Sequence, residues 1–155
     1  LQEMIVNIDF APTILNIAGI QTPSDMQGKS FLPLVAKSTP AAKKSFAATW
    51  RSSMYYHYYE YPYYHRVQPH YGIRNQRYKL IHFYYDVDIW EFYDLQKDPS
   101  EMNNLINNKS YYTLIEHLKK ELYDLKKGYG NTLTLEELRI ISDYDFGGLE
   151  SSKKK

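Results

Sequence analysis

The sequence predicts an α+β fold in which an antiparallel sheet of about four strands packs against one long helix near the C-terminus. Strand-like segments occupy 45–56, 71–81 and 89–95, and the turn at Asp86–Asp88 is short enough for a hairpin. A strongly periodic apolar pattern over 111–127 is typical of an amphipathic helix. The length of 155 residues fits one domain or parts of two. The simplest topology is therefore a meander that this helix covers.

The first predicted element is a short helix between Asp9 and Gly19. Asp9 can cap its N-terminus, Pro12 falls in the first turn, and Gly19 supplies a left-handed stop. Ile14 and Ile17 recur at helical spacing, so this face is expected to be buried. A helix of this length is marginal alone, so it needs a partner surface.

The best candidate boundary lies at 38–44, where the residues are small, polar and include a proline. Downstream of the predicted strands, Ser110 can cap the long helix and Gly128 ends it. The stripe that should cover the sheet consists of Tyr111, Ile115, Leu118, Leu122 and Leu125. The predicted divisions are 1–44, 45–130 and 131–155, the last with weak helical character and a charged tail.

Composition excludes several classes of function. Nineteen Lys and Arg against 18 Asp and Glu give a net charge of +1, which argues against a nucleic-acid surface. The absence of cysteine excludes disulfides, thiolate metal sites and a cysteine nucleophile. No apolar run approaches the roughly 18 residues of a membrane span, and the first residues lack the order of a signal peptide. The chain begins without Met inside a structured element, so we expect a fragment of a longer protein.

The densest polar-aromatic segment holds the candidate binding residues. Eleven of the 17 tyrosines lie between residues 55 and 85, and Pro62 and Pro69 predict a loop that enters a strand. His65, His70 and Arg74 could converge there on an anionic or hydroxyl-rich ligand, with tyrosine rings facing a sugar. The alternative is that the tyrosines pack at an interface and the histidines are satisfied locally, and spacing alone favours this alternative.

Metal sites are weaker interpretations. His57, His65 and His70 are suitable ligand types, but their spacing lacks an anchoring carboxylate pattern. The acidic residues that could suggest calcium lack the required loop pattern, so turn and capping roles explain them better. They are Asp86, Asp88, Asp94, Asp98 and Glu101. A serine nucleophile elbow and a phosphate-binding glycine loop are also absent from the sequence.

Four segments in consistent order resemble the C-terminal part of the type I sulfatases, members of the alkaline-phosphatase-like superfamily. They are VNIDFAPTILNIAGIQTP, MQGKSFLPLV, HYGIRNQRYKLIHFY and DIWEFYDLQKDPSEMNNL. The first resembles a helix late in the family's catalytic domain, and the last two resemble its closing strands. Residues 1–44 would then be the end of the α/β catalytic domain, and the opening helix would pack onto the remainder.

The resemblance implies a parent enzyme that hydrolyses sulfate esters of glycans. Family members use a formylglycine made from Cys or Ser in a C/S-x-P-x-R motif, together with Ca²⁺ held by Asp and Asn residues. Neither the motif nor the ligands can be assigned in these 155 residues. The implied partner is the missing N-terminal catalytic domain, and this segment alone is expected to be inactive. A periplasmic, secreted or lysosomal location is expected from the family.

Among family members, the tyrosine-rich segment most resembles that of N-acetylglucosamine-6-sulfatase-like glycan sulfatases. In them a histidine of an E-x-P-x-x-H segment, here His65, approaches the substrate, and His70 and Arg74 are carried over with it. Arg77 and Lys79 also occupy family positions but alternate on a strand, which suits packing and ion pairing. A carbohydrate-binding module and a non-catalytic structural or interaction subdomain remain alternative functions.

Overall fold

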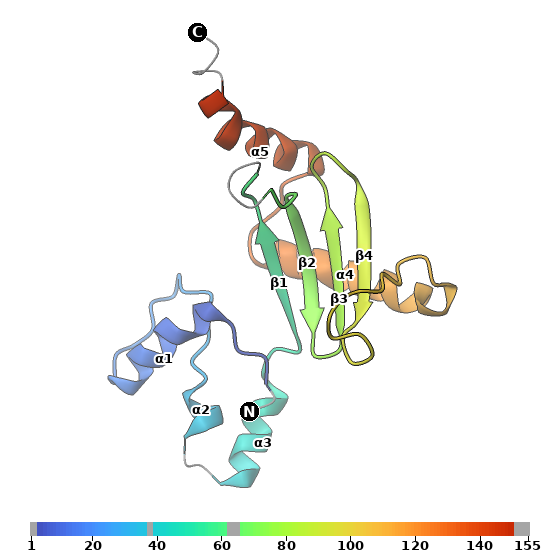
Figure 1. Ribbon diagram of the computed structural model, residues 1–155. Coiled ribbons are helices and arrows are strands. Elements are labelled where there is room, and N and C mark those ends of the chain that lie inside the picture. Colours follow the sequence, from blue (N-terminus) through green and yellow to red (C-terminus); the bar gives the residue numbers. More distant parts are fainter. Residues whose placement is uncertain (1–2, 37–38, 62–65, 151–155) are drawn as a thin grey trace. The chain divides into compact units, whose positions relative to one another are not determined.

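The computed structural model describes residues 3–36, 39–61 and 66–150, and the chain forms two compact units, Leu1–Ser52 and Ser53–Lys155 (Figure 1). The described residues of the first unit form a 3₁₀ turn, η1, and three helices. The second contains a four-stranded sheet, a second 3₁₀ turn, η2, and two helices. The α+β class and the antiparallel sheet packed on a long helix are confirmed. The domain limits expected from the sequence stay predictions.

The first unit is built from short elements: η1 (Asn7–Asp9), α1 (Phe10–Ile17), α2 (Leu32–Val35) and α3 (Pro40–Ala48). Its segments are joined through Thr13, whose hydroxyl donates to the Asp9 carbonyl and accepts from the Phe31 amide. Gly28 permits a close approach of two backbone segments, since an added Cβ would clash with the carbonyl oxygen of Ile8. Backbone contact therefore fixes the loop after α1.

Two expectations for the opening helix were wrong. Asp9 stands at the N-terminus of α1 but makes no side-chain cap, because its carboxylate accepts hydrogen bonds from other partners. Ile14 and Ile17 are 64% and 66% exposed, and the helix instead buries the side that carries Pro12 and Thr13. The apolar stripe is therefore present but uncovered in this unit. Gly19 does adopt the left-handed conformation, with φ of 71°.

The first part of the strand predicted over 45–56 belongs to the helix α3, and the last part, from Ser53, is a strand as expected. Pro40 begins α3, and Thr39 caps it by accepting a hydrogen bond from the Ala42 amide. Alanine-rich sequence favours the helix over the strand that was expected from residue 45. The strand itself, β1 (Ser53–Tyr58), begins eight residues later than predicted.

The second unit is a meander of β1, β2 (His70–Asn75), β3 (Tyr78–Phe83) and β4 (Ile89–Asp94), with all neighbours antiparallel. The segment 71–81, expected to be one strand, forms β2 and β3 with a tight turn between them. The Asn75 side chain accepts from the amides of Arg77 and Tyr78 and so closes this turn.

One face of this sheet carries the core. The long helix α4 (Tyr112–Gly128) follows η2 (Lys109–Tyr111) and packs against β1, β2 and β3. The Asn108 side chain, rather than the predicted Ser110, accepts the hydrogen bond that starts η2. The helix α5 (Leu135–Glu150) adds a further buried residue, Leu138.

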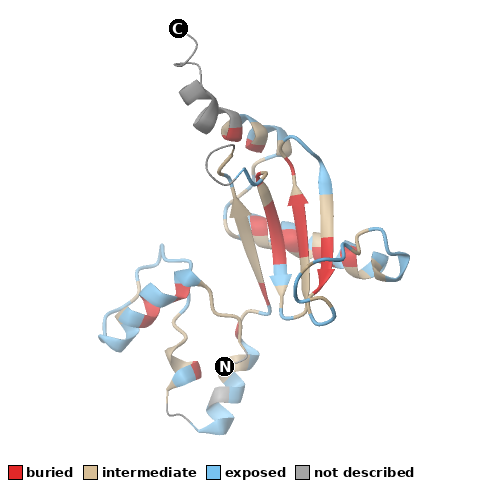
Figure 2. Ribbon diagram, in the orientation of Figure 1, coloured by how far each residue is buried: buried red, intermediate tan, exposed pale blue. Residues whose placement is uncertain are grey.

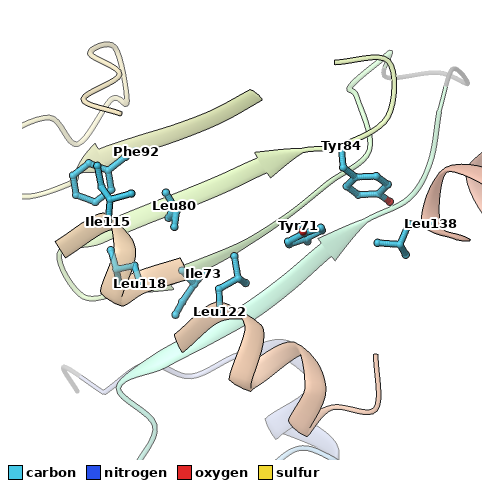
Figure 3. Packing of buried hydrophobic residues seen from close by; sticks show 9 residues of the cluster. All are labelled: Tyr71, Ile73, Leu80, Tyr84, Phe92, Ile115, Leu118, Leu122 and Leu138. Atoms are coloured by element: carbon cyan, nitrogen blue, oxygen red, sulfur yellow. The ribbon is translucent and has the colours of Figure 1, made fainter. Parts of the chain in front are cut away.

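Figures 2 and 3 show where this burial is concentrated, on the inner strands and on α4. The buried cluster comprises Tyr71, Ile73, Leu80, Tyr84, Phe92, Ile115, Leu118, Leu122 and Leu138. Three of the five residues of the predicted helix stripe belong to it. In the described part of the chain, no helix is long and apolar enough to cross a membrane.

Candidate functional site

The candidate binding residues of β2 lie on the face of the sheet away from α4. Alternate side chains of a strand point to opposite faces, and Tyr71 and Ile73 belong to the core on the α4 face. His70, Gly72 and Arg74 therefore share the other face, here called the second face. Cross-strand register adds Tyr56, Tyr58, Lys79, Ile81 and Phe83 to it.

His70 stands in a row of rings that crosses three strands. Its register partners are Tyr58 on β1 and Phe83 on β3. The ring of Tyr58 stacks on the imidazole with centroids 5.4 Å apart, and Phe83 lies 4.9 Å away on the other side. The Nδ1 atom of His70 donates to the carbonyl oxygen of Gln68 at 2.8 Å. This imidazole is thus held in orientation by rings and by one hydrogen bond.

Gly72 leaves room for Tyr56 on the same face. A Cβ at Gly72 would lie 2.6 Å both from the Tyr56 hydroxyl and from the carbonyl oxygen of Leu80. Burial raises the pKa of the Tyr56 hydroxyl well above its usual value, more than the nearby charge of Arg74 lowers it. The hydroxyls of Tyr56 and Tyr58 are buried and have no hydrogen-bond partner among the described residues.

Arg74 is exposed and stands opposite Met54 on one side and Lys79 on the other. Within the described residues, no ion pair or hydrogen bond engages its guanidinium. Lys79 differs, because its ammonium bonds to Glu101 at 2.6 Å. Arg74 is thus the guanidinium on this face that is available to an anion.

Asp86 bonds to two described residues that lie between β1 and β2, Tyr61 and Gln68. The Tyr61 hydroxyl and the Gln68 amide nitrogen donate to the same carboxylate oxygen, at 3.0 and 2.9 Å. The amide of Asp86 donates in return to the Gln68 side-chain oxygen at 3.4 Å. His65 lies outside the described residues, so the structure joins His70 and Arg74 on one face and leaves His65 as a prediction.

Of the three histidines considered as metal ligands, the structure describes His57 and His70, and these two do not lie together. His57 lies on the α4 face, opposite to His70, and its ring nitrogens bond to the hydroxyls of Tyr55 and Tyr84. Among the described residues, no group of three or more His, Cys, Asp or Glu could hold a metal ion.

The acidic residues considered for calcium have structural partners instead. Asp94 accepts two hydrogen bonds from Arg77, and Asp88 accepts one from His82. Asp98 accepts from the Asn103 amide, and Glu101 pairs with Lys79. The ion-pairing roles expected for Arg77 and Lys79 are therefore observed.

Sequence reasoning missed a polar network within the core. Burial, followed by the charges of Lys126 and His70, lowers the pKa of His57 to about 3. Burial likewise lowers the pKa of His82, although the hydrogen bond to Asp88 opposes this shift. Arg139 of α5 donates to the Tyr84 carbonyl. No local sequence pattern indicates the contact between Arg139 and Tyr84, because the two residues are 55 positions apart.

The chain is similar in sequence to proteins of one known family. The profile described as N-sulphoglucosamine sulphohydrolase, C-terminal, matches residues 1–128. An N-acetylglucosamine-6-O-sulfatase of Bacteroides thetaiotaomicron is 48% identical over 126 residues, which make up 80% of this chain and 21% of that protein. An ulvan-active sulfatase of Formosa agariphila is 27% identical over 160 residues, 85% of this chain and 30% of its own.

A solved structure shows the same arrangement. It is a complex of a protein with its substrate D-glucosamine-2-N,6-O-disulfate, with a TM-score of 0.74 and 46% identity. The match covers 83% of this chain and 25% of the solved one. The chain therefore spans less than a third of the length of each of these relatives.

Proposed function

The chain belongs to the type I sulfatase family, and we propose that it forms the C-terminal part of a sulfatase that hydrolyses sulfate esters of glycans. This part lines one side of the substrate pocket, while the remainder of the enzyme supplies the reacting groups. The relatives act on or bind sulfated sugars, as their names state, and this supports a sulfated glucosamine as the substrate class.

The nucleophile and the metal would belong to the part of the parent enzyme that lies outside this chain. The described residues do not fit a calcium site, because no three of their His, Cys, Asp or Glu side chains could hold a metal ion together. The carboxylates of Asp94, Asp88, Glu101 and Asp98 are engaged by Arg77, His82, Lys79 and a backbone amide. The formylglycine and Ca²⁺ of the family would supply the nucleophile and charge stabilisation from elsewhere.

One observation carries the proposed role of this chain: His70 and Arg74 share the second face, and the guanidinium of Arg74 is unpaired among the described residues. A guanidinium matches the oxygens of a sulfate or a carboxylate. The rings of Tyr58 and Phe83 offer apolar surface beside His70, which suits the flat face of a sugar. His65, which precedes β2 in the sequence, would complete this wall.

A second candidate role is that of an interaction subdomain. The exposed Ile14 and Ile17 and the buried, partnerless hydroxyls of Tyr56 and Tyr58 favour it, since both would be satisfied by a covering protein surface. The two roles are compatible in one parent enzyme. A stand-alone carbohydrate-binding module, in contrast, requires measurable glycan affinity of the 155-residue chain by itself.

The test compares three proteins on an aryl sulfate and on glucosamine 6-sulfate with calcium present. They are the full-length enzyme that contains this segment, the same enzyme with the Cys or Ser of its C/S-x-P-x-R motif replaced by Ala, and the 155-residue chain alone. Only the first is expected to release sulfate. Turnover by the chain alone that survives repurification, or no sulfate release by the full-length enzyme, would overturn the proposal.

A further inference from the structure

We infer that Asp86 is a positioning residue that acts through Gln68 to present His70 as a hydrogen-bond acceptor, so that His70 recognises a hydroxyl or amide N–H group of the sugar and not its sulfate. The statement about the sugar rests on the proposed function. The hydrogen bonds that link Asp86, Gln68 and His70, here called the Asp86 relay, are independent of the proposed function.

The first step of the relay is a two-point hold on the Gln68 side chain. Its Nε2 donates to the Asp86 carboxylate at 2.9 Å, and its Oε1 accepts from the Asp86 amide at 3.4 Å. A carboxylate only accepts and an amide N–H only donates, so this pairing fixes which way the Gln68 amide points. The hydroxyl of Tyr61 donates to the same oxygen of Asp86 at 3.0 Å.

The second step fixes the Gln68 backbone. Pro69 follows Gln68 and restricts it to an extended conformation. Pro69 is itself fully buried, and its carbonyl accepts from the Tyr84 amide at 3.2 Å. The carbonyl of Gln68 is therefore held between an anchored side chain and an anchored next residue, and it accepts from Nδ1 of His70.

The third step sets the tautomer of His70. A carbonyl oxygen has no hydrogen to donate, so Nδ1 must carry the proton in this 2.8 Å bond. In the neutral ring the lone pair is then on Nε2. The stacked ring of Tyr58 and the tilted ring of Phe83 restrict rotation of the imidazole, and among the described residues no partner bonds to Nε2.

The chemistry of the ligand follows from this lone pair. A sugar hydroxyl or an acetamido N–H can donate to Nε2, whereas the oxygens of a sulfate ester can only accept. Arg74, four residues along the same face, is the suitable partner for an anionic group. The second face would thus separate recognition of the sugar from recognition of charge.

The relay is tested by nitrogen NMR on the histidine-labelled 155-residue chain, at a pH where the imidazole is neutral. Wild type is expected to show a protonated Nδ1 and an unprotonated Nε2 at His70. Asp86→Ala and Gln68→Ala should mix the tautomers, while Asp86→Asn retains an accepting oxygen and should restore the wild-type pattern. Val87→Ala, in the same turn, is the matched control. A protonated Nε2 in wild type, or no change in Asp86→Ala, would overturn the relay.

The role in substrate recognition is tested separately in the full-length enzyme. Asp86→Ala should raise KM for a sulfated glucosamine by about three- to tenfold, the loss of one hydrogen bond, and leave kcat and the KM for an aryl sulfate unchanged. Asp86→Asn should again recover. If Asp86→Ala and His70→Ala both leave every kinetic constant unchanged, His70 does not read the sugar. A full-length enzyme without sulfatase activity would remove the proposed function, whereas the NMR result would still decide the relay.

Discussion

Asp9 and Arg51, 42 residues apart in the chain, form a two-point ion pair in which each carboxylate oxygen accepts from one guanidinium nitrogen. Asp9 is completely buried and Arg51 is 10% exposed. The same carboxylate accepts from the amides of Val6 and Lys29, each at 2.9 Å. These bonds outweigh the cost of burial and lower the pKa of Asp9. The aspartate that opens the D-x-A-P-T segment is therefore a structural anchor of the first unit.

Removal of Arg51 should destabilise the first unit, because a buried carboxylate would lose its counter-charge. We expect Arg51→Met to lower the free energy of unfolding by about 2–4 kcal/mol, less than for a fully isolated charge because two amides still bond to Asp9. Urea denaturation followed by the fluorescence of Trp50, in a Trp90→Phe background, measures this unit. Lys29→Ala is the control, since only the backbone of Lys29 contacts Asp9. Equal midpoints for the two variants would contradict the prediction.

The sequence predicted the elements whose signal is local. The helix over 111–127 has its stripe and its terminal glycine within one segment, and α4 ends at Gly128 as expected. The helix α3 was missed because aromatic and β-branched residues near its end suggested a strand, whereas Thr39 and Pro40 start a helix upstream. The turn between β2 and β3 depends on hydrogen bonds that the Asn75 side chain accepts. The strand-like residue pattern continues through this turn, so the sequence did not indicate it.

The candidate site was predictable only in part. Alternation along β2 places His70 and Arg74 on one face once the strand is known. The control of His70 by Asp86 was not predictable. Asp86 lies between β3 and β4, whereas its partner Gln68 precedes β2, 18 residues earlier in the chain. The hydrogen-bond contact of His57 with Asn131 likewise joins residues that are 74 positions apart. Contacts between distant segments require the fold.

Gly72→Ala should destabilise the second unit, because its Cβ would meet the Leu80 carbonyl oxygen and the Tyr56 ring within 2.7 Å. We expect a loss of about 1–3 kcal/mol from overpacking in urea or thermal unfolding. Gly128→Ala is the matched control, since nothing lies within 4 Å of the added Cβ in α4, and stability should stay equal or rise. A Gly72→Ala chain as stable as Gly128→Ala would show that the sheet yields at this point.

The free energy of unfolding should fall as the pH is lowered from about 7 to about 5. The pKa of His57 is about 3 in the folded chain against 6.5 ordinarily, so the unfolded chain takes up a proton in this range and the folded chain does not. The slope should be below the ~1.4 kcal/mol per pH unit of a fully buried group, because the ring is only partly buried. Asp9 and Asp94, whose carboxyl pKa values are lowered by folding, affect the free energy of unfolding only at lower pH.

Urea denaturation across this pH range measures the slope for wild type and for His57→Gln. The variant should show a smaller slope, with the remainder due to His82. His117→Gln, at an exposed position of α4, is the control and should retain the wild-type slope. An unchanged slope in His57→Gln would mean that His57 takes up its proton equally in the folded and unfolded chains.

The 155-residue chain should self-associate through the exposed face of α1. Ile14 and Ile17 are more than three-fifths exposed on the same helix face, and burial of such surface stabilises a contact. Sedimentation should therefore show oligomers that dissociate in Ile14→Gln/Ile17→Gln. Tyr112→Gln, equally exposed on α4, is the control. A monomeric wild-type chain at high concentration would contradict this expectation.

The last prediction concerns His65 in the full-length enzyme, and it rests on the family segment E-x-P-x-x-H together with the placement of His70 and Arg74 on one face. If His65 bonds to the sugar or the sulfate, His65→Ala deletes one partner of a bond to a charged or polar group. Such a bond contributes about 1.5–3 kcal/mol, which corresponds to about ten- to a hundredfold in kcat/KM. His117→Ala should have almost no effect.

The choice of substrate separates the possible roles of His65. A small aryl sulfate lacks the sugar, so a residue that contacts the sugar should affect the natural glycan more strongly than the aryl sulfate. Equal losses on both substrates would place His65 at the sulfate, where every substrate needs it. No loss on either would return His65 to a locally satisfied loop histidine, because a side chain that touches neither the sugar nor the sulfate cannot stabilise the transition state of either reaction.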